Sequence, residues 1–134
     1  MTASWTYYGF QMALMGNGTN GGAARIAAFA RLYLSTSVPN IDETVGIWNE
    51  VSGGGYAARA ITHADWTYTP NPSRIVLVDL IWPFSSALTG VAGAYITDSL
   101  GNVMAWWDKI PVFNPNPGDM VLLDNMTLRL NVGV

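Results

Sequence analysis

The sequence predicts a mainly β protein: an antiparallel β-sandwich or jelly roll preceded by a short N-terminal helix. The clearest sign is a strict alternation of two residue sets over residues 25–35, which has the period of a strand. In all, seven or eight short strands are expected, separated by turns rich in Gly, Pro, Asn and Asp. The 134 residues contain no repeat or linker, so we expect one domain. We divide it into a helix and arm over residues 1–24 and a β body over residues 25–134.

The N-terminal helix is predicted from side-chain spacing. Trp5, Tyr8, Met12 and Met15 recur at steps of three and four residues, and glycines follow from position 16. This pattern is typical of an amphipathic helix of about two to three turns. Residues 1–24 carry no charged side chain, but their Gly and Asn residues interrupt the apolar run. We therefore expect no membrane segment there.

The β body begins with the strand over residues 25–35, in which Ala28, Ala30, Leu32 and Leu34 share one face. Later strands are predicted from shorter apolar runs, and residues 74–81 form one such run that contains Asp79. The further expected strands are residues 47–51, 56–62, 63–69, 74–81, 91–98, 103–108, 120–123 and 126–132. The main expected loops and turns are residues 39–46, 52–55, 70–73, 98–102 and 114–119.

Charged residues are scarce. Six basic and nine acidic side chains give a net charge of −3, and half of all residues are apolar. The basic residues are scattered singly, whereas nucleic-acid binding needs a clustered basic footprint, so we exclude that class. A surface so poor in charge is expected to face other protein, above all in the uncharged residues 1–24 and 80–97. Our candidate interface residues are Trp5, Tyr8, Met12, Trp82, Phe84 and Leu88.

No set of residues suggests catalysis. The single histidine, His63, has Asp65 two residues away, and a catalytic triad needs a more widely assembled set. The glycines of residues 52–55 are not followed by the Lys-Ser or Lys-Thr of a phosphate-binding loop. They predict a sharp bend where backbone approaches backbone. We expect no enzyme activity, no cofactor and no metal site, and the absence of cysteine excludes disulfides and thiolate metal sites. Most acids lie in expected turns, where Asp bonds its own backbone: Asp42, Glu43, Asp98, Asp119 and Asp124.

The aromatic residues are the strongest non-enzymatic signal. The chain has six tryptophans, and Trp106 and Trp107 are adjacent, so on a strand their rings face opposite sides. Trp side chains are enriched at protein interfaces and also form platforms on which sugars stack. A glycan platform would need exposed rings at Trp48, Trp66, Trp82 or Trp107.

The segment EVSGGGYA, residues 50–57, resembles a motif of a group of small virion proteins of tailed bacteriophages. Members are described as capsid decoration (cement) proteins or as tail-fibre-like proteins. Residues 32–36, LYLST, are similar to the strand that precedes this motif in the family. Residues 94–98, AYITD, and 102–107, NVMAWW, are similar to two later segments of the family. The ending with PGD at residues 117–119 also resembles the family. The motif turn consists of Glu50, Ser52, Gly53, Gly54, Gly55 and Tyr56.

The resemblance implies a non-enzymatic structural protein with a β-sandwich-like body. The role that it favours is that of a capsid decoration protein on the outer surface of the virion. The partners would be the major capsid protein and neighbouring copies of the same chain. The alternative is a tail or tail-fibre component that contacts host glycans. We expect a homo-oligomer, because most oligomers are assembled from one kind of subunit. One departure is Ala58, where the family carries an Arg; here the charge comes at Arg59, on the other face of a strand.

Overall fold

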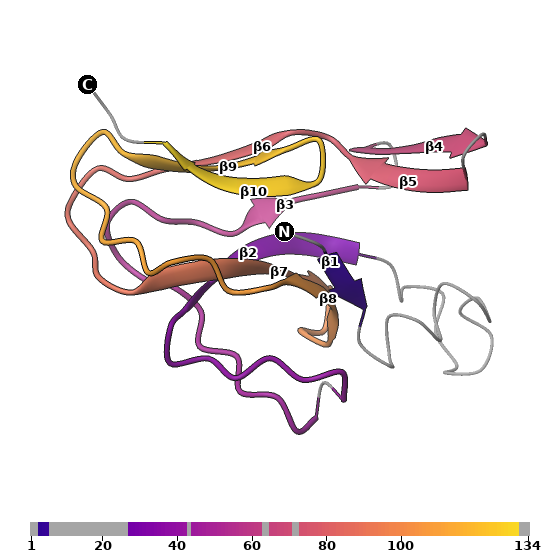
Figure 1. Cartoon of the computed structure of the whole chain (residues 1–134), viewed down its shortest axis with the longest axis horizontal. Coiled ribbons are helices and arrows are strands. Elements are labelled where there is room, and N and C mark those ends of the chain that lie inside the picture. The colour runs from indigo at the N-terminus through magenta and orange to yellow at the C-terminus, as the bar shows by residue number, and fades with distance from the viewer. Residues whose placement is uncertain (1–2, 6–26, 43, 63–64, 71–72, 132–134) are drawn as a thin grey trace.

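The computed structural model describes residues 3–5, 27–42, 44–62, 65–70 and 73–131. Within these ranges the chain is almost entirely β structure (Figure 1), so the prediction of a mainly β protein is confirmed. None of the described segments is a helix long and apolar enough to cross a membrane. The strands are β1 (Ala3–Trp5), β2 (Ala27–Leu34), β3 (Arg59–Ala60), β4 (Trp66–Pro70), β5 (Ser73–Leu77), β6 (Leu80–Pro83), β7 (Val91–Asp98), β8 (Val103–Trp107), β9 (Met120–Asp124) and β10 (Thr127–Asn131).

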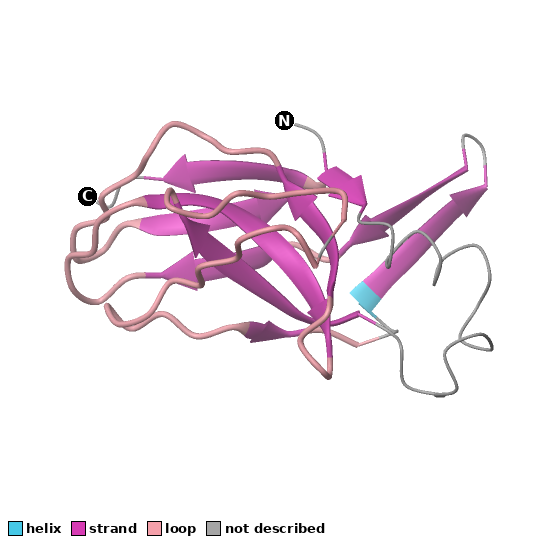
Figure 2. Ribbon diagram, turned by 90° about the horizontal axis from the view of Figure 1, so that it is seen from below, coloured by secondary structure: helices cyan, strands magenta, loops and turns pink. Residues whose placement is uncertain are grey.

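The strands form two main sheets and one hairpin, and every pairing is antiparallel. The larger sheet has the order β1-β8-β7-β2-β3, the smaller sheet has the order β10-β9-β6, and β4 pairs only with β5. The β4–β5 hairpin extends from one end of the body (Figures 1 and 2). Trp5 ends a strand and lies opposite Ala105 in β8, whereas the sequence predicted a helix there. The remainder of that predicted helix lies outside the described residues.

The two sheets pack face to face over one core (Figure 1). Alternation in the smaller sheet is clear in β6, where Leu80 and Trp82 are buried and Ile81 and Pro83 are exposed. Each fully buried large apolar side chain contributes about 1.5–3 kcal/mol relative to exposure, so this layer of residues dominates stability. The core residues that the two sheets contribute include Ala30, Leu32, Ala94, Ile96 and Trp107 from the larger sheet, and Leu80, Trp82, Val121, Leu123 and Leu128 from the smaller.

Strand β7 is buried along its whole length. All eight of its residues are inaccessible, although a strand with one wet face would alternate. The second covered face carries a separate cluster built on Tyr33, Tyr95 and Val103, against which Trp48 and Trp106 pack. The loop of residues 36–50 therefore covers the outside of the larger sheet. The loop explains why residues 91–97 carry no charge, because they are interior residues. The expectation that residues 80–97 form a contact surface is therefore wrong for much of this segment.

The run over residues 74–81 forms two strands and not one. β5 ends at Leu77, β6 begins at Leu80, and the exposed Val78 and Asp79 lie between them. The break separates two sheets, because β5 pairs with β4 and β6 pairs with β9. Asp79 is exposed at the break and accepts a hydrogen bond from the Asn125 amide at 3.0 Å. Two other predicted strands also shrink: residues 56–62 keep only β3, and residues 47–51 form isolated bridges.

A two-residue turn joins β9 to β10. Asn125 and Met126 both have positive φ, at 50° and 64°, which is the signature of a type I′ hairpin. The sequence placed Met126 inside the last strand, whereas that strand begins one residue later. Met126 packs against the core, its sulfur accepts a hydrogen bond from the Leu77 amide, and its carbonyl accepts one from the Trp107 indole at 2.8 Å. These contacts hold Met126 in a left-handed backbone conformation that residues other than glycine rarely adopt.

Tyr33 and Gly93 form a close cross-strand pair between β2 and β7. The Tyr33 ring occupies the space that a side chain at Gly93 would fill: a Cβ there would lie 2.2 Å from the ring. The Tyr33 hydroxyl donates a hydrogen bond of 2.6 Å to the Trp107 carbonyl, so the ring cannot shift freely. The glycine is thus required by the close approach of the ring.

Candidate functional site

The motif turn over residues 50–56 packs against the segment that follows β6. Gly53, Gly54 and Gly55 have φ values of 82°, 63° and 80°, in the left-handed region that favours glycine. A Cβ on Gly54 would lie 2.6 Å from Leu88, and one on Gly55 would lie 2.4 Å from the Ser85 hydroxyl. The Ser85 amide donates to the Gly54 carbonyl at 2.8 Å. The prediction of a bend where backbone approaches backbone is confirmed.

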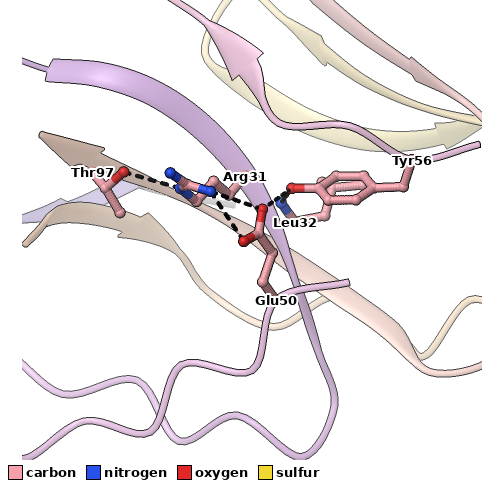
Figure 3. A network of polar contacts seen from close by, with 5 residues as sticks. All are labelled: Arg31, Leu32, Glu50, Tyr56 and Thr97. Atoms are coloured by element: carbon pink, nitrogen blue, oxygen red, sulfur yellow. Dashed lines mark hydrogen bonds and ion pairs between the residues drawn. The ribbon is translucent and has the colours of Figure 1, made fainter. Parts of the chain in front are cut away.

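The ends of the motif turn are joined by a polar network that we call the Glu50 clasp: Arg31, Glu50, Tyr56, Thr97 and the Leu32 amide (Figure 3). Arg31 Nη1 donates to both carboxylate oxygens of Glu50 at 3.0 and 3.1 Å, and Arg31 Nε donates to Thr97 Oγ1 at 3.1 Å. The Tyr56 hydroxyl donates to Glu50 Oε2 at 2.7 Å and accepts from the Leu32 amide at 3.0 Å.

The Glu50 clasp completes the edge of β2. β3 pairs with β2 only at Phe29 and Ala30, which would leave the amide of Leu32 without a strand partner. The Tyr56 hydroxyl supplies that partner, and the Val51 amide donates to the Leu32 carbonyl at 3.0 Å. The motif therefore closes a sheet edge as well as a turn.

The tyrosine of the clasp is not an acid that works near neutral pH. Burial, and then the hydrogen bond to Glu50, raise the pKa of Tyr56 far above its ordinary value of 10.0. Glu50 is held by an ion pair to Arg31 that is only partly exposed, at 32% and 23% of the two side chains. The hydrogen bonds drawn in Figure 3 join strands β2 and β7 to the two ends of the motif turn.

The acids of the predicted turns bond the backbone as expected. Asp42 Oδ1 accepts from the Thr44 amide, Asp98 Oδ1 accepts from the amides of Leu100 and Asn102, and Asp119 Oδ2 accepts from Asn116. Asp124 instead forms an exposed ion pair with Arg129 at 3.1 Å. Across the described ranges, no three His, Asp or Glu side chains gather as a metal would require. Glu43 and His63 lie outside the described residues.

Two of the candidate interface residues belong to the core. Trp82 is 1% exposed and Phe84 is 2% exposed, because both point between the two sheets. Leu88 is partly buried, packing against that core and beside Gly54. Trp82 and Phe84 are therefore packing residues and not an accessible interface. Trp5 lies on β1, while Tyr8 and Met12 are outside the described residues.

The tryptophans are mostly committed to packing. Trp107, like Trp82, is 1% exposed, and Trp66 is partly buried against the core. Trp48 stacks on Tyr95 with ring centroids 5.5 Å apart and meets Trp106 edge-on at 5.9 Å. These rings fasten the loop of residues 36–50 to the larger sheet.

A surface that sequence reasoning missed lies on residues 38–47, which we call the 38–47 loop. Val38, Ile41, Val45 and Ile47 are each about half exposed or more, at 54%, 49%, 63% and 51%. The segment was predicted only as a loop. Its signal in the sequence is four aliphatic residues within ten positions that also hold a Pro and a Gly, a composition unusual for a solvated loop.

The fold and the Glu50 clasp define a class: a mainly β, antiparallel protein whose distinctive motif holds its own sheets together. Comparison with protein-family models, with curated protein sequences and with solved structures gives no match. The function is therefore inferred from the residues, from the resemblance of the motif turn and from the geometry of the fold.

Proposed function

We propose that this chain is a non-enzymatic structural protein of a tailed-bacteriophage virion, namely a capsid decoration protein on the outer surface of the shell. Its partners in this proposal are the major capsid protein and neighbouring copies of the same chain. The observation that carries the proposal is the use made of the motif that resembles the phage family: Glu50, Tyr56 and the glycines between them join the β2 edge to the segment after β6.

A decoration protein has to transmit force across a joint without changing shape, and the Glu50 clasp suits that requirement. Charge-assisted hydrogen bonds are about twice as strong as neutral ones. The clasp has two of them, from Arg31 Nη1 to the two carboxylate oxygens of Glu50, between segments that are distant in sequence. Such a protein gains its hold from several modest contacts acting together rather than from one pocket. Exposed aliphatic side chains on the 38–47 loop offer contacts of that kind.

The alternative, a tail or tail-fibre component that binds host glycans, has less support. Sugar stacking requires a free ring face, whereas Trp48 stacks on Tyr95 and lies so close to Gly46 that a Cβ there would be 2.7 Å from its indole nitrogen. Trp82 and Trp107 are buried. Partial exposure leaves Trp48, Trp66 and Trp106 as the rings that a glycan test should examine.

The proposal is tested on purified phage particles assembled with and without this chain. We expect mass spectrometry to find the chain in the complete particles, and a cryo-electron microscopy map to place it on the outer shell. Particles without it should release their DNA at a lower temperature, which a DNA-binding dye reports during heating. Density on the tail would favour the alternative, and absence from purified particles that contain all other virion proteins would overturn the proposal.

A further inference from the structure

The 38–47 loop concentrates exposed apolar surface on one projection. Among the described residues, four of the large hydrophobic side chains that are strongly exposed belong to this loop. They are Val38, Ile41, Val45 and Ile47. Val38 and Ile47 form a bridge of two backbone hydrogen bonds, at 2.7 and 2.9 Å, so their side chains are held as a pair. Exposed apolar side chains gathered in one short segment are typical of interaction sites on soluble proteins.

The base of the 38–47 loop is fixed to the body. The Leu34 amide donates to the Asn49 carbonyl at 2.8 Å, and the Asn49 amide donates to the Ser37 hydroxyl at 2.9 Å. Trp48 adds its ring contacts with Tyr95. Because the base is already ordered, docking of the loop loses little conformational entropy, which favours binding.

A complementary surface lies on the opposite side of the body, on the outer face of the β10-β9-β6 sheet. Ile81 is 47% exposed and lies directly opposite Leu122, which lies directly opposite Arg129, so the three form one row across the sheet. The neighbours of Ile81 in β6 and of Leu122 in β9 point into the core. Figure 1 shows the 36–50 loop below the larger sheet and this sheet above it, so the two surfaces face away from each other.

Charge distinguishes the ways in which two copies could meet. The described residues of the 38–47 loop include one acidic side chain, Asp42, and no basic one, so a contact between two such loops would bring like charges together. The outer face of the smaller sheet offers Arg129, whose side chain is 54% exposed. Its ion pair with Asp124 is itself exposed and worth little, so the guanidinium can be shared with a second carboxylate.

We propose that copies of this chain associate head to tail, with the 38–47 loop of one copy on the Ile81–Leu122–Arg129 row of the next. This contact is heterologous: each copy uses two different surfaces, and the assembly becomes a ring if the rotation closes and a chain if it does not. It goes beyond the proposed function, because purified protein should self-associate without any virus particle.

The test uses one variant for each surface. Val45→Asp adds charge to the 38–47 loop, and Ile81→Glu adds charge to the sheet face; Leu100→Asp is the matched control, since Leu100 is 71% exposed and belongs to neither surface. Molar mass is measured by light scattering after size exclusion, over a range of concentrations. Wild type and Leu100→Asp should exceed the 14.5 kDa of one chain, while Val45→Asp and Ile81→Glu should each remain at that mass.

Mixing the two variants gives the decisive result. The Val45→Asp variant keeps an intact sheet face and the Ile81→Glu variant keeps an intact loop, so an equimolar mixture should form pairs of twice 14.5 kDa. Circular dichroism confirms that each variant is folded, and Val45→Ser with Ile81→Thr replaces them if either is not. The proposal is overturned if wild type stays monomeric, if Ile81→Glu still self-associates through its loop, or if the mixture remains monomeric.

Discussion

Replacement of Gly93 by alanine should destabilise the protein through a single steric contact. The new Cβ would lie 2.2 Å from the Cζ and hydroxyl oxygen of Tyr33 and 2.5 Å from another ring carbon. Tyr33 has no accessible surface and is bonded to the Trp107 carbonyl, while β7 is buried on both faces. Neither side of the contact can therefore move into solvent.

The cost follows from two effects. Forcing an extra methyl group into a packed core costs about 1–3 kcal/mol. If the Tyr33 ring swings aside, its buried hydroxyl loses its partner, which costs roughly another 1–3 kcal/mol. The reduced freedom of alanine in the unfolded chain returns about 0.4–1 kcal/mol. We expect a net loss of about 3 kcal/mol, which lowers the melting temperature of a domain of this size by roughly 10 °C.

A double-mutant cycle with Tyr33→Val, followed by tryptophan fluorescence in urea, measures the contact. With the ring removed, Gly93→Ala should cost almost nothing. Gly101→Ala is the control for backbone strain alone: its φ is +88° and nothing lies within 4 Å of its Cβ position, so about 1 kcal/mol is expected. The reasoning is refuted if Gly93→Ala costs no more than this control, or costs the same with and without the Tyr33 ring.

Three further measurements probe the core, the buried tyrosines and the clasp. In urea unfolding, Trp82→Phe should lower the free energy of unfolding by about 1–3 kcal/mol less than Trp107→Phe does. The reason is that the Trp107 indole N–H donates to a backbone carbonyl, whereas that of Trp82 has no partner among the described residues. Equal losses in the two variants would contradict this. Burial, with the nearby Glu50 second, raises the pKa of Tyr95 from 10.0 to about 12. The raised pKa supports the fold below pH 10, and that support should disappear between pH 10 and 12. Urea unfolding at several pH values compares the wild type with Tyr95→Phe, and a loss of stability of the same size in both proteins would contradict this. Glu50→Gln should reduce the free energy of unfolding by roughly 2 kcal/mol, while Ser52→Ala, at an exposed position, should leave it unchanged. Calorimetry measures both variants. Equal losses would show that the clasp does not stabilise the fold.

The strands that could be predicted are those whose local pattern agrees with their final environment. Residues 91–98 match β7, and the turn after them forms as its Asp-Ser-Leu-Gly-Asn sequence indicates. The glycine bend at residues 52–55 was also predictable, since three consecutive glycines suit a conformation that side chains resist.

The elements that could not be predicted depend on contacts between distant residues. The pattern of residues 74–81 is apolar enough for one strand, and only the packing of β5 and β6 into different sheets shows why it breaks at Asp79. Arg31 and Glu50 form the clasp because β2 and the motif turn meet in space. Trp82 is likewise buried because the larger sheet faces it, whereas the lack of charge in residues 80–97 had suggested an interface.

The enclosure of β7 has a consequence for how the chain opens. β7 pairs with β2 along its length and with β8 at Tyr95, Ile96 and Thr97, while Val91 bonds Phe113, and both faces of β7 are covered. No local fluctuation exposes its amides, so hydrogen exchange along β7 should occur only through global unfolding. The eight residues of this strand would then act as built-in reporters: their slowest exchange rates, in free protein or in an assembly, measure the stability of the whole body.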